Sequence, residues 1–399
     1  MKIKIDKGIA RGAVEAPPSK SYAHRLLICS ALAQGESTVC GISESEDMVA
    51  TLACLDALGV KYNKTGDTVS VNGGIREGTR LFDCRESGST LRFFIPIALL
   101  TGEKCVFTGT ERLISRGIGV YEEIFKSRDI FYSIDKASVT VEGKLKAGEF
   151  NVRGDISSQF ISGLLFALPL LDGDSRINIT TELESSAYVD ITIETLSSFG
   201  VKIERKGNAF FIKGNQKYTP ASIKVEGDLS NSAFLDALNC FGGEVCVNNI
   251  NENTIQGDKV YREYFKLLAE GSPTVDISAC PDLGPILFAV AGAKNGATVT
   301  GTRRLKIKES DRVLSMKTEL EKLCITVTDC DDYVVIANNG FKAPNKELYG
   351  HNDHRIVMAL SVLLTACGGV IDGYEAVKKS YPDFFKVLAR LGINCEVIE

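Results

Sequence analysis

One local pattern recurs six times along this chain of 399 residues: a turn of glycine, serine or aspartate opens an apolar helical run. The apolar residues follow at helical spacing, as in Phe160, Ile161 and Leu164. Repeats of about 70 residues are longer than those of ordinary solenoids, so the period predicts small α/β layers packed around shared cores. The intervals are 68, 69, 72, 52 and 71 residues, counted between Ser21, Ser89, Ser158, Ser230, Asp282 and Asp353.

A second helix is predicted in every repeat, followed by a turn and by strands of alternating polarity such as Tyr333–Ala337. Each repeat is therefore expected to hold two helices and a few strands. The second helices are predicted over Asp47–Val60, Gly119–Ile130, Val189–Val201, Lys259–Gly271, Ser310–Ile325 and Ser380–Ile393.

Two domains of three repeats each are the expected organisation, because 399 residues exceed what one hydrophobic core ordinarily serves. The polar segment Lys213–Glu226, which carries Pro220, separates the third repeat from the fourth. We therefore predict a first domain over residues 17–227 and a second over residues 228–399, with a first crossing at Pro17-Pro18.

Composition excludes several classes of protein. The net charge of -5 opposes a general nucleic-acid binder. Three histidines and twelve cysteines without a Cys-x-x-Cys pair disfavour a metal site and fit a reducing cytosol. The start, Met1–Asp6, lacks the apolar core of a secretory signal, and Ile356–Ile371 is too short and interrupted to cross a bilayer. We predict a soluble cytoplasmic protein.

Lysines and arginines gather near the starts of these helices although the total charge is negative. Helix N-termini offer unpaired N–H groups to anions, and arginine adds bidentate contact with phosphate or carboxylate. Solvated surface charge is the alternative for any single residue. The cations are Lys20, Arg25, Arg85, Arg92, Arg153 and Arg355 at first helices, and Arg116, Lys308, Arg312 and Lys379 at second helices.

Two carboxylates are candidate proton carriers. Glu309 lies within the basic segment Arg303–Arg312, and Asp282 lies between two prolines at the start of an apolar helix. The structural alternatives are that Glu309 neutralises its basic neighbours and that Asp282 caps a helix. A carboxylate held at a helix start is also suited to act as a general base. We interpret His24 as structural and leave His354 open between a structural and a catalytic role.

Seven short segments follow one another in order: Pro18-Ser19-Lys20-Ser21 with His24-Arg25, Ser87-Gly88-Ser89-Thr90-Leu91-Arg92, Ser157-Ser158-Gln159, Pro281-Asp282, Lys308-Glu309-Ser310-Asp311-Arg312, Asn352-Asp353-His354-Arg355 and Lys379-Ser380-Tyr381-Pro382-Asp383. Together they resemble the 5-enolpyruvylshikimate-3-phosphate synthase family across nearly the whole chain. The resemblance implies an α/β fold, namely a two-domain inside-out α/β barrel of six βαβαββ repeats with its active site in the interdomain cleft. It also implies that residues 1–16 pack onto the second domain.

The implied reaction moves the enolpyruvyl group of phosphoenolpyruvate to the 5-hydroxyl of shikimate 3-phosphate, releases phosphate and needs no metal or other cofactor. By motif match, the resemblance implies that Asp282 takes the hydroxyl proton. It implies that Glu309 and Lys20 exchange protons with the methylene carbon and the leaving phosphate.

Two anions bound side by side repel each other, which gives a physical reason for so many cations. The resemblance assigns shikimate 3-phosphate to Lys20, Ser21, Arg25, Ser157, Ser158, Gln159, Ser185, Asp282 and Lys308, with Tyr188 under the ring. It assigns phosphoenolpyruvate to Lys20, Gly88, Arg116, Gln159, Arg312, Arg355 and Lys379.

The chain departs from the family pattern at three places. Glu86-Ser87-Gly88-Ser89 replaces Asn-Ala-Gly-Thr or Asn-Ser-Gly-Thr close to where glyphosate competes, which leaves inhibitor sensitivity open. Ser185-Ser186-Ala187-Tyr188 replaces Ser-Lys-Pro-Tyr, so either Ser185 or Ser186 is the phosphate contact. Arg304 occupies a position that is often asparagine, and its role is open.

Two other functions compete with this reading. UDP-N-acetylglucosamine enolpyruvyl transferase shares the fold and the donor, but that family has Lys-Asn in place of Lys20-Ser21 and a reactive cysteine in the loop matching Ile114–Ile118. A non-catalytic repeat scaffold with a basic pocket would bind anions without turnover. We predict a monomeric enzyme that acts on the two small molecules and on neither nucleic acid nor membrane.

Overall fold

The structure is a computed structural model that describes residues 1–398. The chain packs as two compact units. The central unit is Pro18–Glu226, and the terminal unit joins Met1–Pro17 to the segment that starts at Gly227. No helix in residues 1–398 combines the length and the apolar character needed to span a bilayer.

The central unit contains seven α-helices and twelve strands within the described chain. The helices are α1 (Lys20–Leu32), α2 (Glu46–Ala57), α3 (Gly88–Ala98), α4 (Glu111–Ser115), α5 (Gly119–Lys126), α6 (Ser158–Ala167) and α7 (Ser186–Ser198). The strands are β3 (Gly35–Cys40), β4 (Lys61–Thr65), β5 (Thr68–Gly73), β6 (Leu81–Asp83), β7 (Cys105–Thr108), β8 (Phe131–Ile134), β9 (Ser138–Glu142), β10 (Glu149–Val152), β11 (Ser175–Ile179), β12 (Ile203–Lys206), β13 (Ala209–Ile212) and β14 (Ser222–Lys224).

The terminal unit contains the remaining α-helices and strands. The helices are α8 (Leu229–Asp236), α9 (Tyr261–Glu270), α10 (Gly284–Ala293), α11 (Arg312–Glu321), α12 (His354–Cys367) and α13 (Phe384–Arg390), with short 3-10 helices η4 (Pro281–Leu283), η5 (Arg303–Ile307) and η6 (Tyr374–Lys379) among others. The strands are β1 (Lys2–Ile5), β2 (Arg11–Glu15), β15 (Glu244–Asn248), β16 (Thr274–Asp276), β17 (Ala297–Thr300), β18 (Ile325–Cys330), β19 (Tyr333–Asn338), β20 (Leu348–Tyr349), β21 (Gly369–Asp372) and β22 (Cys395–Ile398).

Five of the repeats share one sheet order in the described chain, which confirms the predicted βαβαββ pattern for them. In the second repeat β6 pairs in parallel with β7, and β9 lies between β7 and β8 in antiparallel pairing. The sheets β10-β11-β13-β12 and β16-β17-β19-β18 have the same order. Strands distant in sequence complete two other sheets, since β14 pairs with β3 and β1 pairs with both β21 and β22.

The structure of the fourth repeat explains why one interval of the sequence pattern, from Ser230 to Asp282, is shorter than the others. Its sheet has only the parallel strands β2 and β15 among the described residues. The hairpin that ends the other repeats is missing there, which shortens the spacing between Ser230 and Asp282 to 52 residues. The fourth repeat thus keeps two helices and a parallel pair of strands but lacks the hairpin among the described residues.

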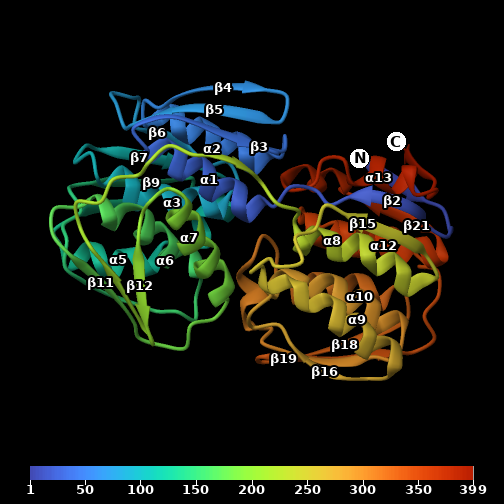
Figure 1. Ribbon diagram of the computed structural model, residues 1–399. Coiled ribbons are helices and arrows are strands. Elements are labelled where there is room, and N and C mark those ends of the chain that lie inside the picture. The colour runs from blue at the N-terminus through green and yellow to red at the C-terminus, as the bar shows by residue number, and fades with distance from the viewer. Residues whose placement is uncertain (399) are drawn as a thin grey trace. The chain divides into compact units, whose positions relative to one another are not determined.

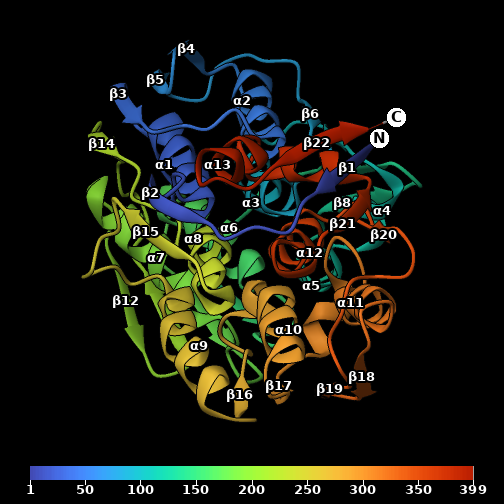
Figure 2. The same ribbon diagram turned by 90° about the vertical axis from the view of Figure 1, so that its right-hand side faces the viewer.

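The first helix of each repeat is buried on nearly all sides, as expected of a helix that is apolar all round. Every residue of α10 from Gly284 to Gly292 is buried, and α3 and α6 pack against each other. Figure 1 shows α1, α3 and α6 inside the central unit with strands such as β4, β5 and β12 at its outside. Figure 2 shows α8, α10 and α12 in the interior of the terminal unit, with strands and the helices α9, α11 and α13 around them.

The helix caps differ in place from the predicted openings. Ser87, Ser157 and Asp228 accept the capping bonds of α3, α6 and α8, one or two residues before the serines that we predicted. Asp353 caps α12 as its position suggested, whereas Asp282 caps no α-helix and lies within η4. Sequence spacing located each helix start to within about a turn but left the capping residue ambiguous.

Close packing of α3 and α6 depends on Gly163. A Cβ atom added there would lie 2.3 Å from Tyr121 Oη and 2.4 Å from Arg92 O. We expect Gly163→Ala to lower the free energy of unfolding of the central unit by about 1–3 kcal/mol, because neither neighbour can retreat in a close-packed core.

Urea unfolding followed by circular dichroism measures this loss. Gly119→Ala is the matched control, since a Cβ atom at Gly119 meets nothing within 4 Å at the start of α5. Equal stability of the two variants would contradict the packing argument.

Candidate active site

Arg25 is a buried cation held by neutral oxygens. Its side chain lies on α1 in a residue that is 3% exposed, and Nη1 donates to Ser21 O (2.7 Å). Nε donates to Thr192 Oγ1 (2.7 Å), and Nη2 donates to Tyr188 O (2.9 Å) and to Ser162 Oγ at 3.5 Å. Burial lowers the pKa of this guanidinium to about 10. A buried charge without an anionic partner is costly, so the group is suited to receive an anion.

Lys20 begins α1 and is tied to α2. Its Nζ donates to Asp47 Oδ2 at 2.8 Å, and both side chains are mostly buried. His24, one turn further along α1, is 1% exposed, and its Nδ1 lies 2.7 Å from Thr51 Oγ1. Burial, aided by the charges of Lys20 and Arg25, lowers the pKa of His24 well below its ordinary value. A neutral, enclosed ring agrees with the structural role predicted for this histidine.

Gly88, Gln159 and Arg116 form a second group in the central unit. Gln159 bridges two helices, because its Oε1 accepts from Arg92 Nη1 (2.7 Å) and its Nε2 donates to Ser89 Oγ (2.9 Å). The Arg116 guanidinium lies directly over Gly88, where an added Cβ would be 3.1 Å from both terminal nitrogens. The start of α3, the start of α6 and the end of α4 thus present polar groups together.

The serines at the starts of α6 and α7 differ in exposure. Ser157 caps α6 by accepting from the N–H of Gln159, and Ser158 is buried in its first turn. Ser185 precedes α7 in left-handed backbone (φ 54°) and is 1% exposed, whereas Ser186 is half-buried. The geometry leaves the hydroxyl of Ser186 more accessible than that of Ser185.

Asp282 joins three cations in the terminal unit. Its Oδ1 accepts from Arg312 Nη1 at 2.9 Å and lies 3.4 Å from Lys308 Nζ, and its Oδ2 accepts from Arg355 Nη2 at 3.2 Å. Arg355 Nη2 also donates to Ser230 Oγ at 2.6 Å. All three cations were predicted to bind substrate, and the carboxylate at their centre was predicted to be the base.

Asp353 holds Arg312 from the other side. Both are almost inaccessible, and Arg312 Nε donates to Asp353 Oδ2 at 2.8 Å. Burial opposes the charge on Arg312, but the carboxylates of Asp353 and Asp282 outweigh it and raise its pKa. Burial alone would likewise raise the pKa of the Asp353 carboxyl, yet Arg312 holds it below its ordinary value.

Glu309 and Lys379 complete the terminal set. Glu309 Oε2 lies 2.9 Å from His354 Nδ1, which makes His354 a direct partner of the predicted proton carrier. Lys379 ends η6, and its Nζ donates to Asn352 O at 2.5 Å. Glu309, Asp353 and His354 offer ligand atoms within 4.8 Å of one another. Since Asp353 is already paired with Arg312, that positive charge opposes a metal ion there.

The predicted site residues therefore fall into two sets, one in each unit. Sequence reasoning missed the anions that hold the cations: Asp47 beside Lys20, and Asp353 as the partner of Arg312. The sequence predicted Asp353 only as the start of a helix and not as the partner of an arginine. No sequence signal marked Asp47 as the partner of a lysine. Arg304, whose role was open, is buried and donates to Ser278 O at 3.3 Å.

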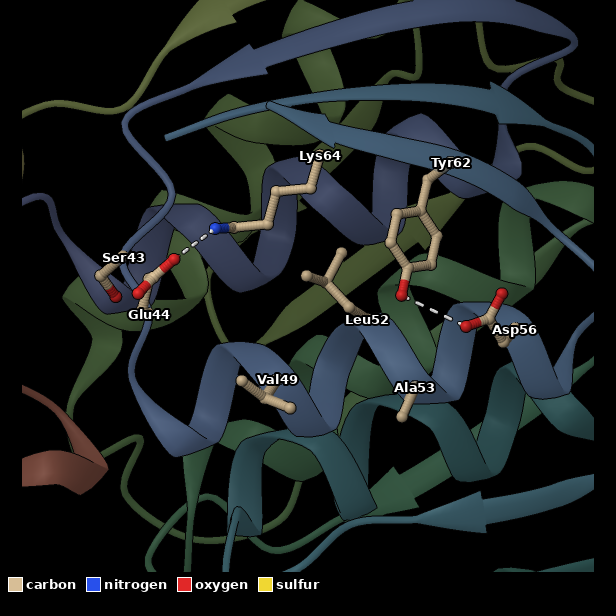
Figure 3. Close-up of a pocket in the computed structure, with 8 residues that line it drawn as sticks. All are labelled: Ser43, Glu44, Val49, Leu52, Ala53, Asp56, Tyr62 and Lys64. Atoms are coloured by element: carbon tan, nitrogen blue, oxygen red, sulfur yellow. Dashed lines mark hydrogen bonds and ion pairs between the residues drawn. The ribbon is translucent and has the colours of Figure 1, made fainter. Parts of the chain in front are cut away.

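A surface cavity of about 390 Å³ in the central unit lies apart from this chemistry (Figure 3). Figure 3 shows Lys64 directed toward Glu44 and Tyr62 toward Asp56, with hydrogen bonds of 3.0 and 3.2 Å. None of its lining residues was predicted to bind substrate; they are Ser43, Glu44, Val49, Leu52, Ala53, Asp56, Tyr62 and Lys64.

The fold is that of enolpyruvyl transferases. An EPSP synthase from Acinetobacter baumannii superposes with a TM-score of 0.82 at 23% identity, and the match covers 100% of both chains. The enolpyruvyl transferase NikO from Streptomyces tendae superposes with a TM-score of 0.75 at 13% identity, covering 99% of this chain and 98% of that one. At such identities the likeness concerns the fold alone.

Sequence comparison gives the family. The family model described as EPSP synthase (3-phosphoshikimate 1-carboxyvinyltransferase) matches residues 6–388. A 3-phosphoshikimate 1-carboxyvinyltransferase from Clostridium kluyveri is 40% identical over 415 residues, which cover 98% of this chain and 97% of the relative. One from Clostridium acetobutylicum is 42% identical over 416 residues, with the same coverage. The chain belongs to the EPSP synthase family.

The buried pair of Arg312 and Asp353 predicts a specific stability change. Because the pKa of Asp353 is depressed below about 3.9, the ion pair stabilises the fold above about pH 4, and the contribution is lost as pH falls through the depressed value. Asp353→Asn should lower the free energy of unfolding by about 3 kcal/mol near pH 7, since it leaves part of a buried charge uncompensated.

Urea unfolding at several pH values tests this. The gap between wild type and Asp353→Asn should narrow below about pH 4, while Asp190→Asn, which breaks an exposed pair with Arg205, should match wild type throughout. A gap independent of pH would contradict the assigned charge state.

Proposed function

We propose that this chain transfers the enolpyruvyl group of phosphoenolpyruvate to the 5-hydroxyl of shikimate 3-phosphate and releases phosphate. Its relatives carry the name 3-phosphoshikimate 1-carboxyvinyltransferase, and the family model spans nearly the whole chain. The physical observation behind the proposal is the buried Arg25. Its guanidinium donates hydrogen bonds to neutral oxygens of Ser21, Tyr188 and Thr192, which do not balance its positive charge. A dianionic phosphate supplies the balancing negative charge.

The two substrates carry several negative charges between them, and both units contribute cations to balance them. We assign the phosphate and ring of shikimate 3-phosphate to Ser21, Arg25, Ser157, Ser158, Gln159 and Ser185 or Ser186, with Lys20, Lys308 and Asp282 near its hydroxyls. We assign phosphoenolpyruvate to Lys20, Gly88, Arg116, Gln159, Arg312, Arg355 and Lys379.

The reaction proceeds by addition and elimination. A proton reaches the methylene carbon of phosphoenolpyruvate, and the 5-hydroxyl oxygen attacks the resulting cationic carbon while Asp282 accepts the hydroxyl proton. The methyl group then loses a proton as the C–O bond to phosphate breaks, which restores the double bond. Glu309 and Lys20 serve these transfers at carbon and at the leaving phosphate, with His354 orienting Glu309.

Asp282 has a second role in the ligand-free protein. Its carboxylate balances Arg312, Arg355 and Lys308, three of the cations assigned to substrate. When the anionic groups of phosphoenolpyruvate contact Arg312 and Arg355, they take over that balance. The carboxylate is then available to accept the hydroxyl proton.

An enzyme that uses UDP-N-acetylglucosamine as acceptor is the alternative. Lys20-Ser21 stands where that family has Lys-Asn, and the segment Ile114–Ile118 lacks its reactive cysteine. We therefore propose shikimate 3-phosphate as the acceptor. We also propose a cytoplasmic monomer that works without a metal ion, a nucleic acid or a membrane.

A phosphate-release assay tests the function. The protein should release phosphate from phosphoenolpyruvate when shikimate 3-phosphate is added, and not when UDP-N-acetylglucosamine replaces it. A well-folded protein that releases no phosphate with either acceptor would leave only the non-catalytic scaffold.

Asp282→Ala tests the proposed base. Turnover should fall at least about 100-fold, as expected for loss of a positioned general base, while both ligands still bind in a calorimetric titration. Asp331→Ala is the control, because Asp331 is an exposed aspartate of the same unit paired only with Arg303. Unchanged turnover in Asp282→Ala would remove Asp282 from this role.

Gly88→Ala tests the phosphoenolpyruvate assignment in the central unit. The added Cβ, 3.1 to 3.2 Å from the Arg116 guanidinium, forces that group to move by a few tenths of an ångström. KM for phosphoenolpyruvate should rise about tenfold, with KM for shikimate 3-phosphate nearly unchanged. In Gly271→Ala, where a Cβ meets nothing within 4 Å, both constants should stay at wild-type values. A rise for shikimate 3-phosphate alone would reverse the assignment.

A further inference from the structure

Glu319 is a buried carboxylate on the same helix as Arg312 but seven residues further along. At 3.6 residues per turn the two side chains lie about two turns apart on one side of α11. Glu319 is 1% exposed and accepts from Lys322 Nζ (2.7 Å) and from the backbone N–H of Tyr349 (2.8 Å). Its other oxygen lies 2.9 Å from His351 Nε2.

His351 belongs to a turn of unusual backbone. Both central residues of the turn, His351 and Asn352, have φ of 50°, in the left-handed region that residues other than glycine seldom adopt, although Asn and His do so more often than most. The N–H of Asp353 donates to Gly350 O at 2.9 Å and closes the turn. The His351 ring also packs edge-on against Tyr349 at 4.9 Å between centroids. A turn of this kind without a central glycine needs contacts from outside to hold it.

The turn carries groups that contact Lys379, Arg312 and Arg355, the terminal-unit residues assigned to phosphoenolpyruvate. The carbonyl of Asn352 accepts from Lys379 Nζ at 2.5 Å, and Asp353 accepts from Arg312 Nε at 2.8 Å. Arg355 donates its backbone N–H to Asp353 Oδ1 at 3.0 Å. Arg312 and Lys379 therefore contact this turn through their charged groups, and Arg355 contacts it through its backbone N–H.

Helix α11 thus holds the turn at two points. Asp353 is bound at the start of the helix by Arg312, and His351 is bound near its end by Glu319. Removing the outer contact leaves the turn attached to α11 at the inner point alone, with Lys379 still bound to Asn352 O and the Gly350 N–H still bound to Asp372 O. The left-handed backbone of His351 should then relax and shift the Asn352 carbonyl and the Asp353 carboxylate.

We propose that His351 and Glu319 are positioning residues, which act through the turn Gly350–Asp353 to place Arg312, Arg355 and Lys379 for phosphoenolpyruvate. Neither residue was assigned to a substrate, and the proposal rests on the proposed function. The three cations are assigned to phosphoenolpyruvate, whereas shikimate 3-phosphate is assigned mostly to residues of the central unit, with Lys308 and Asp282 in this one. Loss of the contact should therefore weaken phosphoenolpyruvate binding more than shikimate 3-phosphate binding.

Three substitutions of His351 separate the effect of its hydrogen bond to Glu319 from the effect of its backbone conformation. His351→Gln keeps a donor that can reach Glu319, His351→Asn keeps a residue tolerant of left-handed backbone but too short to reach, and His351→Ala keeps neither. Lys386→Ala is the control, because it removes an exposed ion pair with Asp383 in the same unit.

Steady-state kinetics with both substrates give the first readout. KM for phosphoenolpyruvate should rise about tenfold in the Ala and Asn variants, stay within about twofold of wild type in the Gln variant, and stay unchanged in Lys386→Ala. KM for shikimate 3-phosphate should change much less than KM for phosphoenolpyruvate in every variant. An equal rise for both substrates, no rise in the Ala and Asn variants, or no recovery in the Gln variant would overturn the proposal.

Hydrogen exchange gives a readout that needs no turnover. The amides of Asp353 and Arg355, which close the turn and its cap, should exchange faster in the Ala and Asn variants and at the wild-type rate in the Gln variant. If wild type shows no turnover, the proposed function fails, and the exchange result still decides whether His351 and Glu319 hold the turn. Wild-type exchange in all three variants would overturn that.

Discussion

The cation cluster of the terminal unit depends on one buried guanidinium between two carboxylates. Arg312 lies at the start of α11, where Asp353 binds it from the cap of α12 and Asp282 binds it from η4. A pair buried to this extent contributes little to stability by itself and is costly when broken. Its main effect is geometric, because it fixes three elements of the unit around one planar group.

Arg25, a buried cation of the central unit, has a different environment. It donates hydrogen bonds to hydroxyl and carbonyl oxygens, its guanidinium lies over the Phe93 ring, and burial lowers its pKa to about 10. Lys20 falls between the two cases, because Asp47 is a carboxylate partner of its ammonium group. The protein therefore has buried cations of two kinds: those paired with carboxylates, such as Arg312, and those with neutral hydrogen-bond partners, such as Arg25. In the proposed function, a phosphate dianion balances Arg25, and the anionic groups of phosphoenolpyruvate replace Asp282 beside Arg312.

Much of the fold could be predicted because it follows from periodicity. Helices such as α10 are apolar all round, and the openings before them recur at near-constant spacing. The missing hairpin of the fourth repeat was not predicted, since an interval of 52 residues does not say which element is absent. Lys20, Arg312 and Arg355 could be located because they sit at helix starts, whereas Arg116 and Lys379 lie at the ends of short helices. Asp47 and Asp353, which pair with Lys20 and Arg312, and Glu319, which contacts His351, could not be predicted, because each contact joins residues distant in sequence. Two consecutive left-handed residues at His351 and Asn352, each costing about 1–3 kcal/mol, leave no signal in the sequence either.

The central claim is that Asp282 balances the cations until phosphoenolpyruvate takes its place. Calorimetric titration of phosphoenolpyruvate into Asp282→Asn, with shikimate 3-phosphate present, tests it most directly. Removing the competing charge should leave the Kd for phosphoenolpyruvate equal to that of wild type or lower. A Kd raised about tenfold or more, equivalent to about 1.4 kcal/mol, would mean that Asp282 builds the cation cluster instead of competing for it, and would contradict the account.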